Sequence, residues 1–131
     1  MTDREQIIWD TLNGPQCVLI GSRAYGINGP DADWDFATDD HTYNLLRKAI
    51  MDLNPSNFNG DQAYENACYF QLDGKTINLM CVAWERREIW KLIVQTIRTL
   101  CQDDTMRGRF MDKNFRVKFF RHMETAMMEY R

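Results

Sequence analysis

Residues 17–36 read CVLIGSRAYGINGPDADWDF, and this segment combines a turn suited to phosphate with a strand that carries two acids. The apolar run Cys17–Ile20 predicts a buried strand that leads directly into Gly21-Ser22. Glycine lets the backbone approach a ligand closely, and the first free N–H groups of a helix attract phosphate. After a short loop, Asp33 and Asp35 alternate along a second strand, so both side chains are expected on the same face.

The two acids predict a cation site. Neighbouring carboxylates repel each other, and a divalent cation is the usual way to relieve that repulsion. Trp34 and Phe36 alternate with Asp33 and Asp35, so one face of the strand is apolar and the other is doubly charged. Such a strand is costly inside a sheet unless its charged face opens on a cleft that holds a cation. The structural alternatives are an ordinary strand–helix turn with Ser22 as N-cap, and a solvated acidic loop.

Asn78 is a third candidate. It lies between Ile77 and Leu79 in a run with no other strongly polar residue. A buried amide without partners costs about 1–3 kcal/mol. If its strand pairs beside the strand of Asp35, the partner is Asp35 or its metal; the alternative is a backbone partner at a sheet edge or bulge.

The order of elements predicts an α+β fold: one domain over residues 1–131, with a small mixed β-sheet and helices packed on it. Capping residues, periodicity and turn residues set the expected bounds. We expect helices over 3–13, 41–53 (capped by Asp39 or Asp40) and, as two C-terminal helices, 84–101 and 111–130; strands over 16–20, 33–38, 67–72 and 76–82; a loop over 54–60; and a hairpin turn at Asp73-Gly74.

Helical spacing also predicts which side chains face the core. The expected inward positions are Ile8 and Leu12; Leu45, Leu46, Ala49, Ile50 and Leu53; Ile89, Leu92, Ile93, Ile97 and Leu100; and Phe115, Phe119, Met123, Ala126, Met127 and Tyr130. The aromatic and methionine side chains of the last helix are interpreted as core, with a surface for a partner protein as the alternative.

Composition narrows the class of protein. No run of eighteen apolar residues occurs and the N-terminus is polar, so we expect a cytoplasmic protein that does not enter a membrane. Four widely spaced cysteines predict free thiols rather than disulfides or a zinc site. Residues 1–106 carry nine basic and sixteen acidic side chains (−7), whereas residues 107–131 carry seven and three (+4). This basic end is interpreted as a solvated helix face, with contact to a polyanion as the alternative.

Gly21-Ser22, ten residues, and then Asp33-Trp34-Asp35-Phe36 together resemble the signature of the DNA-polymerase-β-type nucleotidyltransferase superfamily. The small, single-domain minimal nucleotidyltransferases come closest. The segment Thr76–Met80, Trp90 and the segment Arg116–Phe120 further resemble a phage-encoded branch. The resemblance extends over nearly the whole chain and implies a nucleotidyltransferase-like fold, with the host cytoplasm as the location of a phage protein.

The resemblance also implies an activity: transfer of NMP from an NTP to a hydroxyl of a nucleic acid such as RNA, a protein or a small molecule, with Mg²⁺ or Mn²⁺. Gly21, Ser22 and Arg23 would bind the nucleotide, and Asp33 and Asp35 would bind the metal and, with Asn78, form the catalytic set. Asn78 stands where the family carries a third acid, and a neutral amide cannot act as a base near pH 7.

Two other functions are weighed against this one. A catalytically weak or inactive protein of the same fold would bind a nucleotide or inhibit a partner protein, and the neutral Asn78 favours it. A nucleic-acid binder would instead use the basic residues Arg107, Arg109, Lys113, Arg116, Lys118 and Arg121, with an affinity that falls steeply with salt.

Overall fold

The structure is a computed structural model, and it describes residues 1–53, 58–60 and 66–130. In these ranges the chain is an α+β domain built on a small mixed sheet. Its elements are α1 (Asp3–Leu12), β1 (Cys17–Ile20), α2 (Gly21–Tyr25), β2 (Trp34–Thr38), α3 (Asp40–Leu53), β3 (Phe58–Gly60), β4 (Ala67–Leu72), β5 (Lys75–Cys81), α4 (Trp84–Leu100), α5 (Asp104–Phe110) and α6 (Lys113–Glu129).

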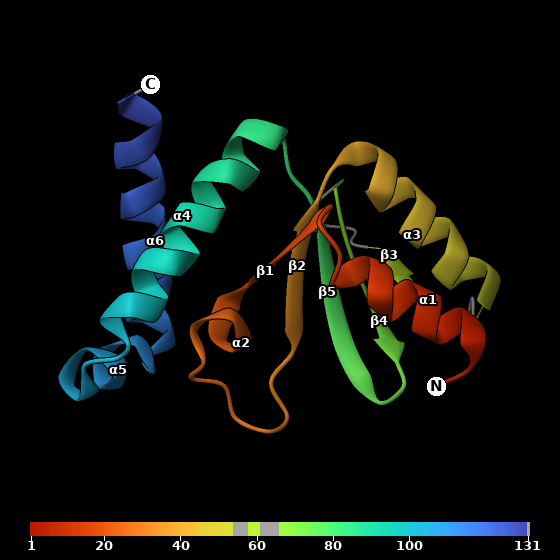
Figure 1. The fold of residues 1–131 in the computed structure, drawn as a ribbon, viewed down its shortest axis with the longest axis horizontal. Helices are drawn as coiled ribbons and strands as arrows, with labels where there is room; N and C mark the ends of the chain where they lie inside the picture. The colour runs from red at the N-terminus through yellow and green to blue at the C-terminus, as the bar shows by residue number, and fades with distance from the viewer. Residues whose placement is uncertain (54–57, 61–65, 131) are drawn as a thin grey trace.

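The elements form three layers. Helices α1 and α3 lie on one side of the sheet, and α2, α4, α5 and α6 lie on the other (Figure 1). The chain starts beside α1 and ends beyond α6, so its two ends lie at opposite sides of the molecule (Figure 1). No helix in the described part of the chain has both the length and the apolar character needed to cross a membrane.

The sheet has five strands in the order β1-β2-β5-β4-β3. Strands β2 and β5 are parallel, and the other neighbouring pairs are antiparallel. The register places Asp35 opposite Ile20 on one side and Asn78 on the other, and Asn78 opposite Tyr69. One row across the sheet therefore places two of the predicted site residues, Asp35 and Asn78, side by side.

The face toward α1 and α3 holds the apolar half of β2. Phe36 is buried there with Ile77 and Leu79 of β5, and Trp34 packs against the same cluster. Ile8 and Leu12 of α1, and Leu46 and Ile50 of α3, cover these side chains as predicted. Leu45 was expected to face the core, but it is 57% exposed because it lies at the open side of the groove between the two helices.

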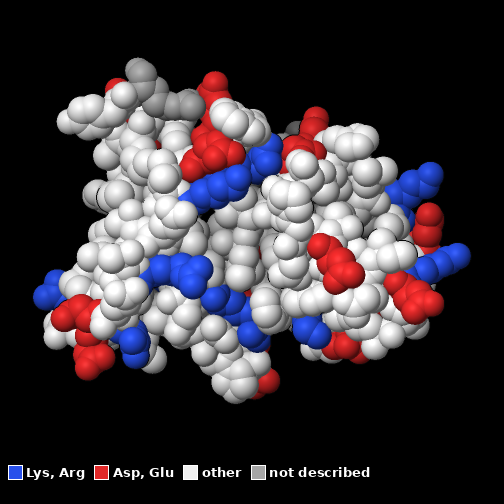
Figure 2. Space-filling model, in the orientation of Figure 1, with Lys and Arg blue, Asp and Glu red and all other residues white. Residues whose placement is uncertain are grey.

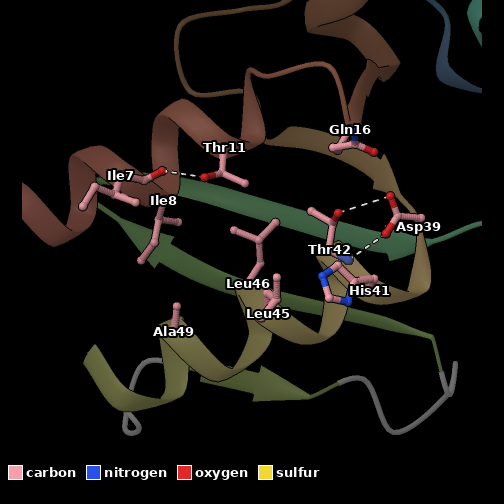
Figure 3. Close-up of a pocket in the computed structure, with 10 residues that line it drawn as sticks. All are labelled: Ile7, Ile8, Thr11, Gln16, Asp39, His41, Thr42, Leu45, Leu46 and Ala49. Carbon is pink, nitrogen blue, oxygen red and sulfur yellow. Dashed lines mark hydrogen bonds between the residues drawn. The ribbon is translucent and has the colours of Figure 1, made fainter.

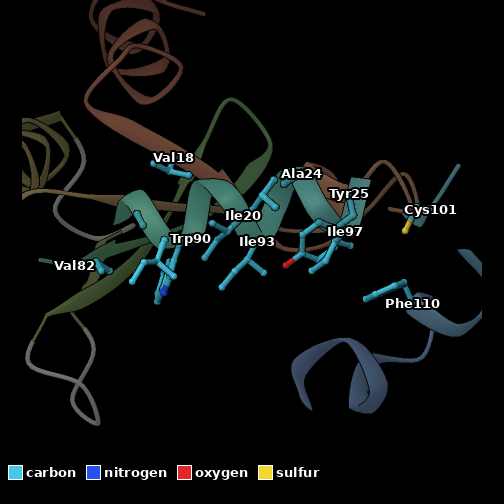
Figure 4. Packing of buried hydrophobic residues seen from close by; sticks show 13 residues of the cluster. Val18, Ile20, Ala24, Tyr25, Val82, Trp90, Ile93, Ile97, Cys101 and Phe110 are labelled. Carbon is cyan, nitrogen blue, oxygen red and sulfur yellow. The ribbon is translucent and has the colours of Figure 1, made fainter. Parts of the chain in front are cut away.

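The opposite face is covered by α4. Val18, Ile20 and Ala37 of the sheet pack with Ile93 and Ile97 of α4, and Phe110 of α5 closes the far end of this cluster (Figure 4). Because strand side chains alternate, Asp35 faces this same side as Ala37, near the edge of the α4 layer. Asp35 and its register partner Asn78 therefore face the α4 side of the sheet.

The C-terminal region differs from the prediction of two helices. Three helices follow β5, because Asp103 and Asp112 each accept a backbone N–H and start separate helices at α5 and α6. Leu92 is 51% exposed on α4, and Ala126 and Tyr130 do not face the core; Tyr130 lies just beyond the last helical residue and is 92% exposed. No residue of α6 is buried, although Phe115, Phe119, Met123 and Met127 pack against the α4 cluster.

The turn between β4 and β5 and the cap of α3 agree with the prediction, whereas residues 58–60 do not. Asp73 and Gly74 have φ of 49° and 77°, the left-handed pair typical of a type I′ hairpin turn between β4 and β5. Asp39 accepts the Thr42 N–H at 2.7 Å and is the cap of α3. Of the loop expected over 54–60, residues 58–60 form β3 and residues 54–57 lie outside the described part. All four cysteines are free thiols, as expected.

Candidate functional site

Asn78 joins the two acids. Its Nδ2 donates to Asp35 Oδ1 at 2.7 Å and to Asp33 Oδ2 at 3.3 Å. The parallel pairing of β2 with β5 makes Asp35 and Asn78 direct register partners, and Asp33 reaches the same amide from just before β2. This arrangement confirms that Asp35 is the partner of Asn78, and it excludes the alternative of an amide whose hydrogen bonds go only to backbone.

The backbone at Gly21 also lies close to the Asp35 carboxylate. It has φ of 75°, in the left-handed region that favours glycine. A Cβ built on Gly21 would overlap Asp35 Oδ2, whereas a Cβ on Gly26, which has the same φ, would meet nothing within 4 Å. The turn therefore needs glycine for two reasons, and the Asp35 carboxylate is enclosed between the Gly21 backbone and the Asn78 amide.

The charge of Asp35 is not fully compensated. Burial is the largest effect and raises the pKa of Asp35, and the neighbouring Asp33 carboxylate raises it further. The hydrogen bond from Asn78 and the positive charges of Lys113 and Arg116 lower the pKa of Asp35 without cancelling the effect of burial. The site is thus a half-buried carboxylate beside an exposed one, and it would gain from a cation.

The donor set fits one Mg²⁺ ion shared with a phosphate ligand. Mg²⁺ prefers oxygen ligands and is usually bound by one or two carboxylates together with substrate phosphates and water. Asp33 and Asp35 supply the carboxylates, and the Asn78 amide can present its oxygen instead of its nitrogen. In the described residues no group of three or more His, Cys, Asp and Glu side chains is placed to hold a metal.

Two further acids, Asp73 and Asp31, lie in turns. Asp73 lies in the β4–β5 turn, where its carboxylate is 3.9 Å from Lys75 Nζ. Asp31 is exposed in the loop before β2. Among the described residues, the Asn78 amide donates to Asp33 and Asp35 and to neither of these two acids.

Ser22 and Arg23 follow Gly21 in the first turn of α2, and the two residues make different contacts within the protein. The Ser22 carbonyl accepts the Ile27 N–H, which closes the loop after this five-residue helix. The Arg23 guanidinium lies 4.2 Å from the centre of the Trp34 ring and donates to the carbonyls of Ala32 (2.9 Å) and Pro30 (3.1 Å). Arg23 therefore fixes the loop that leads to Asp33, and its contact with a nucleotide stays a prediction.

Two hollows open beside the acids, and several of their residues escaped the sequence-based prediction. One, of about 240 Å³, is lined by Asp35, Asn78 and Tyr69; the other, of about 410 Å³, lies between the sheet, α4 and α6 and includes Gly21. Tyr69 is 45% exposed. The sequence contained a signal for the exposed position of Tyr69. This residue alternates along β4 with Cys68, Phe70 and Leu72, which are buried.

A third hollow, of about 680 Å³ and so larger than either of these two, lies away from the acids. It is the groove between α1 and α3, with Ile7, Leu45 and Ala49 along it and Asp39 and His41 at one end (Figure 3). Both oxygens of Asp39 are engaged by Thr42, through its N–H and its hydroxyl (Figure 3). This groove therefore offers apolar surface but no pair of acids suited to a metal.

Basic side chains do not form one dominant surface on the view of Figure 2, where blue and red groups are interspersed. Part of the basic C-terminal set has a structural role. Arg107 donates to the Cys101 carbonyl, and Arg116 donates to the carbonyls of Phe110 and Met111. These bonds satisfy groups at helix ends, which supports the interpretation that much of this charge belongs to the fold.

Comparisons of the chain with protein-family models, curated proteins and solved structures found no match.

Proposed function

We propose that the protein is a Mg²⁺-dependent nucleotidyltransferase that moves an NMP group from an NTP to a hydroxyl acceptor. The observation that supports this most is the convergence of Asp33 and Asp35 on Asn78, directly beside the Gly21 turn. A metal-binding pair next to a turn that lets backbone approach a ligand is the arrangement that phosphoryl transfer requires. On this proposal the small mixed sheet is the core of a nucleotidyltransferase-like fold.

Asp33 and Asp35 would hold the ion, with the Asn78 oxygen as a neutral third ligand. A bound Mg²⁺ ion would neutralise phosphate charge as it develops in the transition state. Gly21 lets the Asp35 carboxylate lie directly against the turn, and the Ser22 hydroxyl would donate a hydrogen bond to the triphosphate. Mn²⁺ has similar ligand preferences and is expected to replace Mg²⁺.

The transfer forms one bond and breaks one. The acceptor oxygen attacks the α-phosphorus, the bond to the bridging oxygen between the α- and β-phosphates breaks, and pyrophosphate leaves with the electron pair. The acceptor proton passes to solvent, because the neutral Asn78 amide cannot take it. The work of the protein is therefore mainly positioning and electrostatic stabilisation.

A second function, nucleotide binding without transfer, is favoured by one specific observation. The Asn78 amide already donates to both acids, so it partly replaces a cation in relieving their repulsion. Because Asn78 is neutral, the three side chains together carry a charge of −2, where three acids would carry −3. A second metal ion would therefore be held less strongly. A protein of this kind would capture a nucleotide or block a partner protein.

The two functions are separated by an assay of transfer together with an assay of binding. The folded protein is incubated with labelled NTPs, Mg²⁺ or Mn²⁺, and separate acceptor pools of RNA, DNA and protein, with D35N as the matched inactive control. Label transferred by the natural protein but not by D35N supports the transferase. Metal-dependent NTP binding with no transfer to any pool supports the second function, and the absence of both overturns the proposal.

A further inference from the structure

The hollow between the sheet, α4 and α6 has the dimensions of a ligand pocket. Its volume is about 410 Å³, inside the range of roughly 300–1,000 Å³ that small-molecule sites occupy. Gly21 lines it and also encloses Asp35, and Met80 lines both this pocket and the smaller hollow that contains Asp35 and Asn78. The pocket therefore adjoins the hollow that contains Asp35 and Asn78.

The polar side chains of the pocket carry a net positive charge. Arg86, Arg116 and Arg121 line it together with one acid, Glu124. Glu124 is already engaged, since it accepts from Arg86 Nη2 at 3.3 Å and from the Trp90 indole. In the described part of the chain, no carboxylate forms an ion pair with Arg116 or Arg121.

Arg116 is held in place without losing its charge. Its Nη1 donates to the carbonyls of Phe110 and Met111 at 3.2 and 3.1 Å, which leaves its other N–H groups available. Its positive charge lowers the pKa of Tyr25 and of Asp35, although burial outweighs this effect at both residues. Arg116 therefore lies within electrostatic reach of the turn and of the acids.

The rest of the pocket wall is apolar. Ile20, Met80 and Val117 contribute aliphatic surface, and the rings of Trp90 and Phe120 meet edge to face with centroids 5.3 Å apart. An inorganic anion would contact the arginines and leave this apolar surface in water. A ligand that joins a planar ring to phosphate groups would cover both kinds of surface.

We infer that this pocket is a nucleotide-binding subsite, in which Arg116 and Arg121 contact phosphate oxygens and the base lies against the apolar wall formed with Phe120. The inference deepens the proposed function, because it states where the nucleotide lies and which cations hold it. Binding of the nucleotide in this pocket does not itself require the metal.

Calorimetry in EDTA tests the pocket apart from the metal site. The probes are ATP, tripolyphosphate and adenosine, and the variants are Arg121→Ala, Arg116→Gln and Phe120→Ala. The matched control is Arg98→Ala, which removes an exposed charge from α4 outside this pocket. Thermal unfolding confirms that each variant is folded.

We expect ATP to bind without metal, and to bind more tightly than either fragment. Arg121→Ala and Arg116→Gln each remove a charge-assisted hydrogen bond and should weaken the binding of ATP about tenfold. Arg98→Ala should leave the affinity for ATP unchanged. Phe120→Ala should weaken the binding of ATP and of adenosine but not the binding of tripolyphosphate. D35N should not weaken metal-free binding, because it removes a negative charge beside an anion.

The outcomes also separate this inference from the proposed transferase. Natural affinity for ATP in both arginine variants, or ATP that binds no better than tripolyphosphate, would overturn the subsite even if transfer activity is found. Metal-free binding that depends on both arginines would support the subsite even in a protein that shows no Mg²⁺-dependent transfer.

Discussion

The Asp35 carboxylate occupies the space in which a side chain at Gly21 would begin. Its other oxygen accepts the Asn78 amide at 2.7 Å, so the group is held from two directions by two strands and a turn. Site geometry and backbone conformation are coupled at this point, and the coupling can be measured.

Gly21→Ala should destabilise the protein more than Gly26→Ala. Both residues have φ of 75°, and a non-glycine residue there costs about 1–2 kcal/mol. Only at Gly21 does the added methyl group also overlap Asp35, which should cost roughly 1–3 kcal/mol more. Denaturant unfolding of both variants measures the difference.

A third variant identifies the cause. Asp35→Ala removes the overlapping carboxylate, so the double variant with Gly21→Ala should recover the extra loss of stability. Equal losses for the two glycine variants would show that Asp35 does not restrict residue 21.

D35N should be as stable as the natural protein, or up to about 1 kcal/mol more stable, because it removes a half-buried charge and its repulsion with Asp33. Added Mg²⁺ or Mn²⁺ should raise the melting temperature of the natural protein but not of D35N. Asp31→Asn, at an exposed loop position, is the matched control and should keep the metal response. A loss of several kcal/mol in D35N would instead identify Asp35 as a structural partner of a basic group.

Asn78→Asp should convert the shared amide into a third carboxylate. Without metal we expect a loss of about 1–3 kcal/mol, since three like charges meet and two hydrogen bonds are lost. With Mn²⁺ the variant should show a larger thermal shift than the natural protein, and transfer activity should rise if the neutral amide limits it.

The control for this variant adds the same charge elsewhere. Asn44→Asp lies on an exposed position of α3, on the other side of the sheet from the acids. A metal response in Asn78→Asp no larger than that in Asn44→Asp would argue against a metal between Asp33 and Asp35.

Stability at alkaline pH should depend on Tyr25. Burial raises the pKa of this phenol to about 12, from an ordinary value of 10.0. Between these two values the unfolded chain loses the proton while the folded protein keeps it, so the free energy of unfolding falls as pH rises, by about 3 kcal/mol in total. Tyr25→Phe should reduce this decline, as measured by denaturant unfolding from pH 9 to about pH 12. An unchanged decline would assign the effect to other groups.

The two strands of the site could be predicted because their patterns are simple. Asp33 and Asp35 alternate with Trp34 and Phe36, and this alternation alone places the acids and the rings on opposite sides of β2. Asp73-Gly74 likewise determines the turn that brings Asn78 into β5, because a type I′ turn needs two left-handed residues.

Other features depended on tertiary contacts that no local pattern contains. The role of Arg23 follows from the path of the loop over Trp34, not from its position beside Ser22. Leu92 has the spacing of a core residue, but the helix side on which it lies has no covering element among the described residues, and the side chain is exposed. The seven-residue helix α5 is too short for periodicity to detect, and only its cap, Asp103, indicates it.

The parallel pairing of β2 with β5 has a consequence for the stage of folding at which the site forms. Parallel neighbours cannot be joined by a tight turn, and here α3 and the strands β3 and β4 intervene along the chain. Until β5 has docked, Asp33 and Asp35 are close in sequence, with only Trp34 between them, but lack the amide that bridges them. On the proposed function, the ability to bind a divalent ion should therefore arise late in folding, and ion uptake would report a completed sheet.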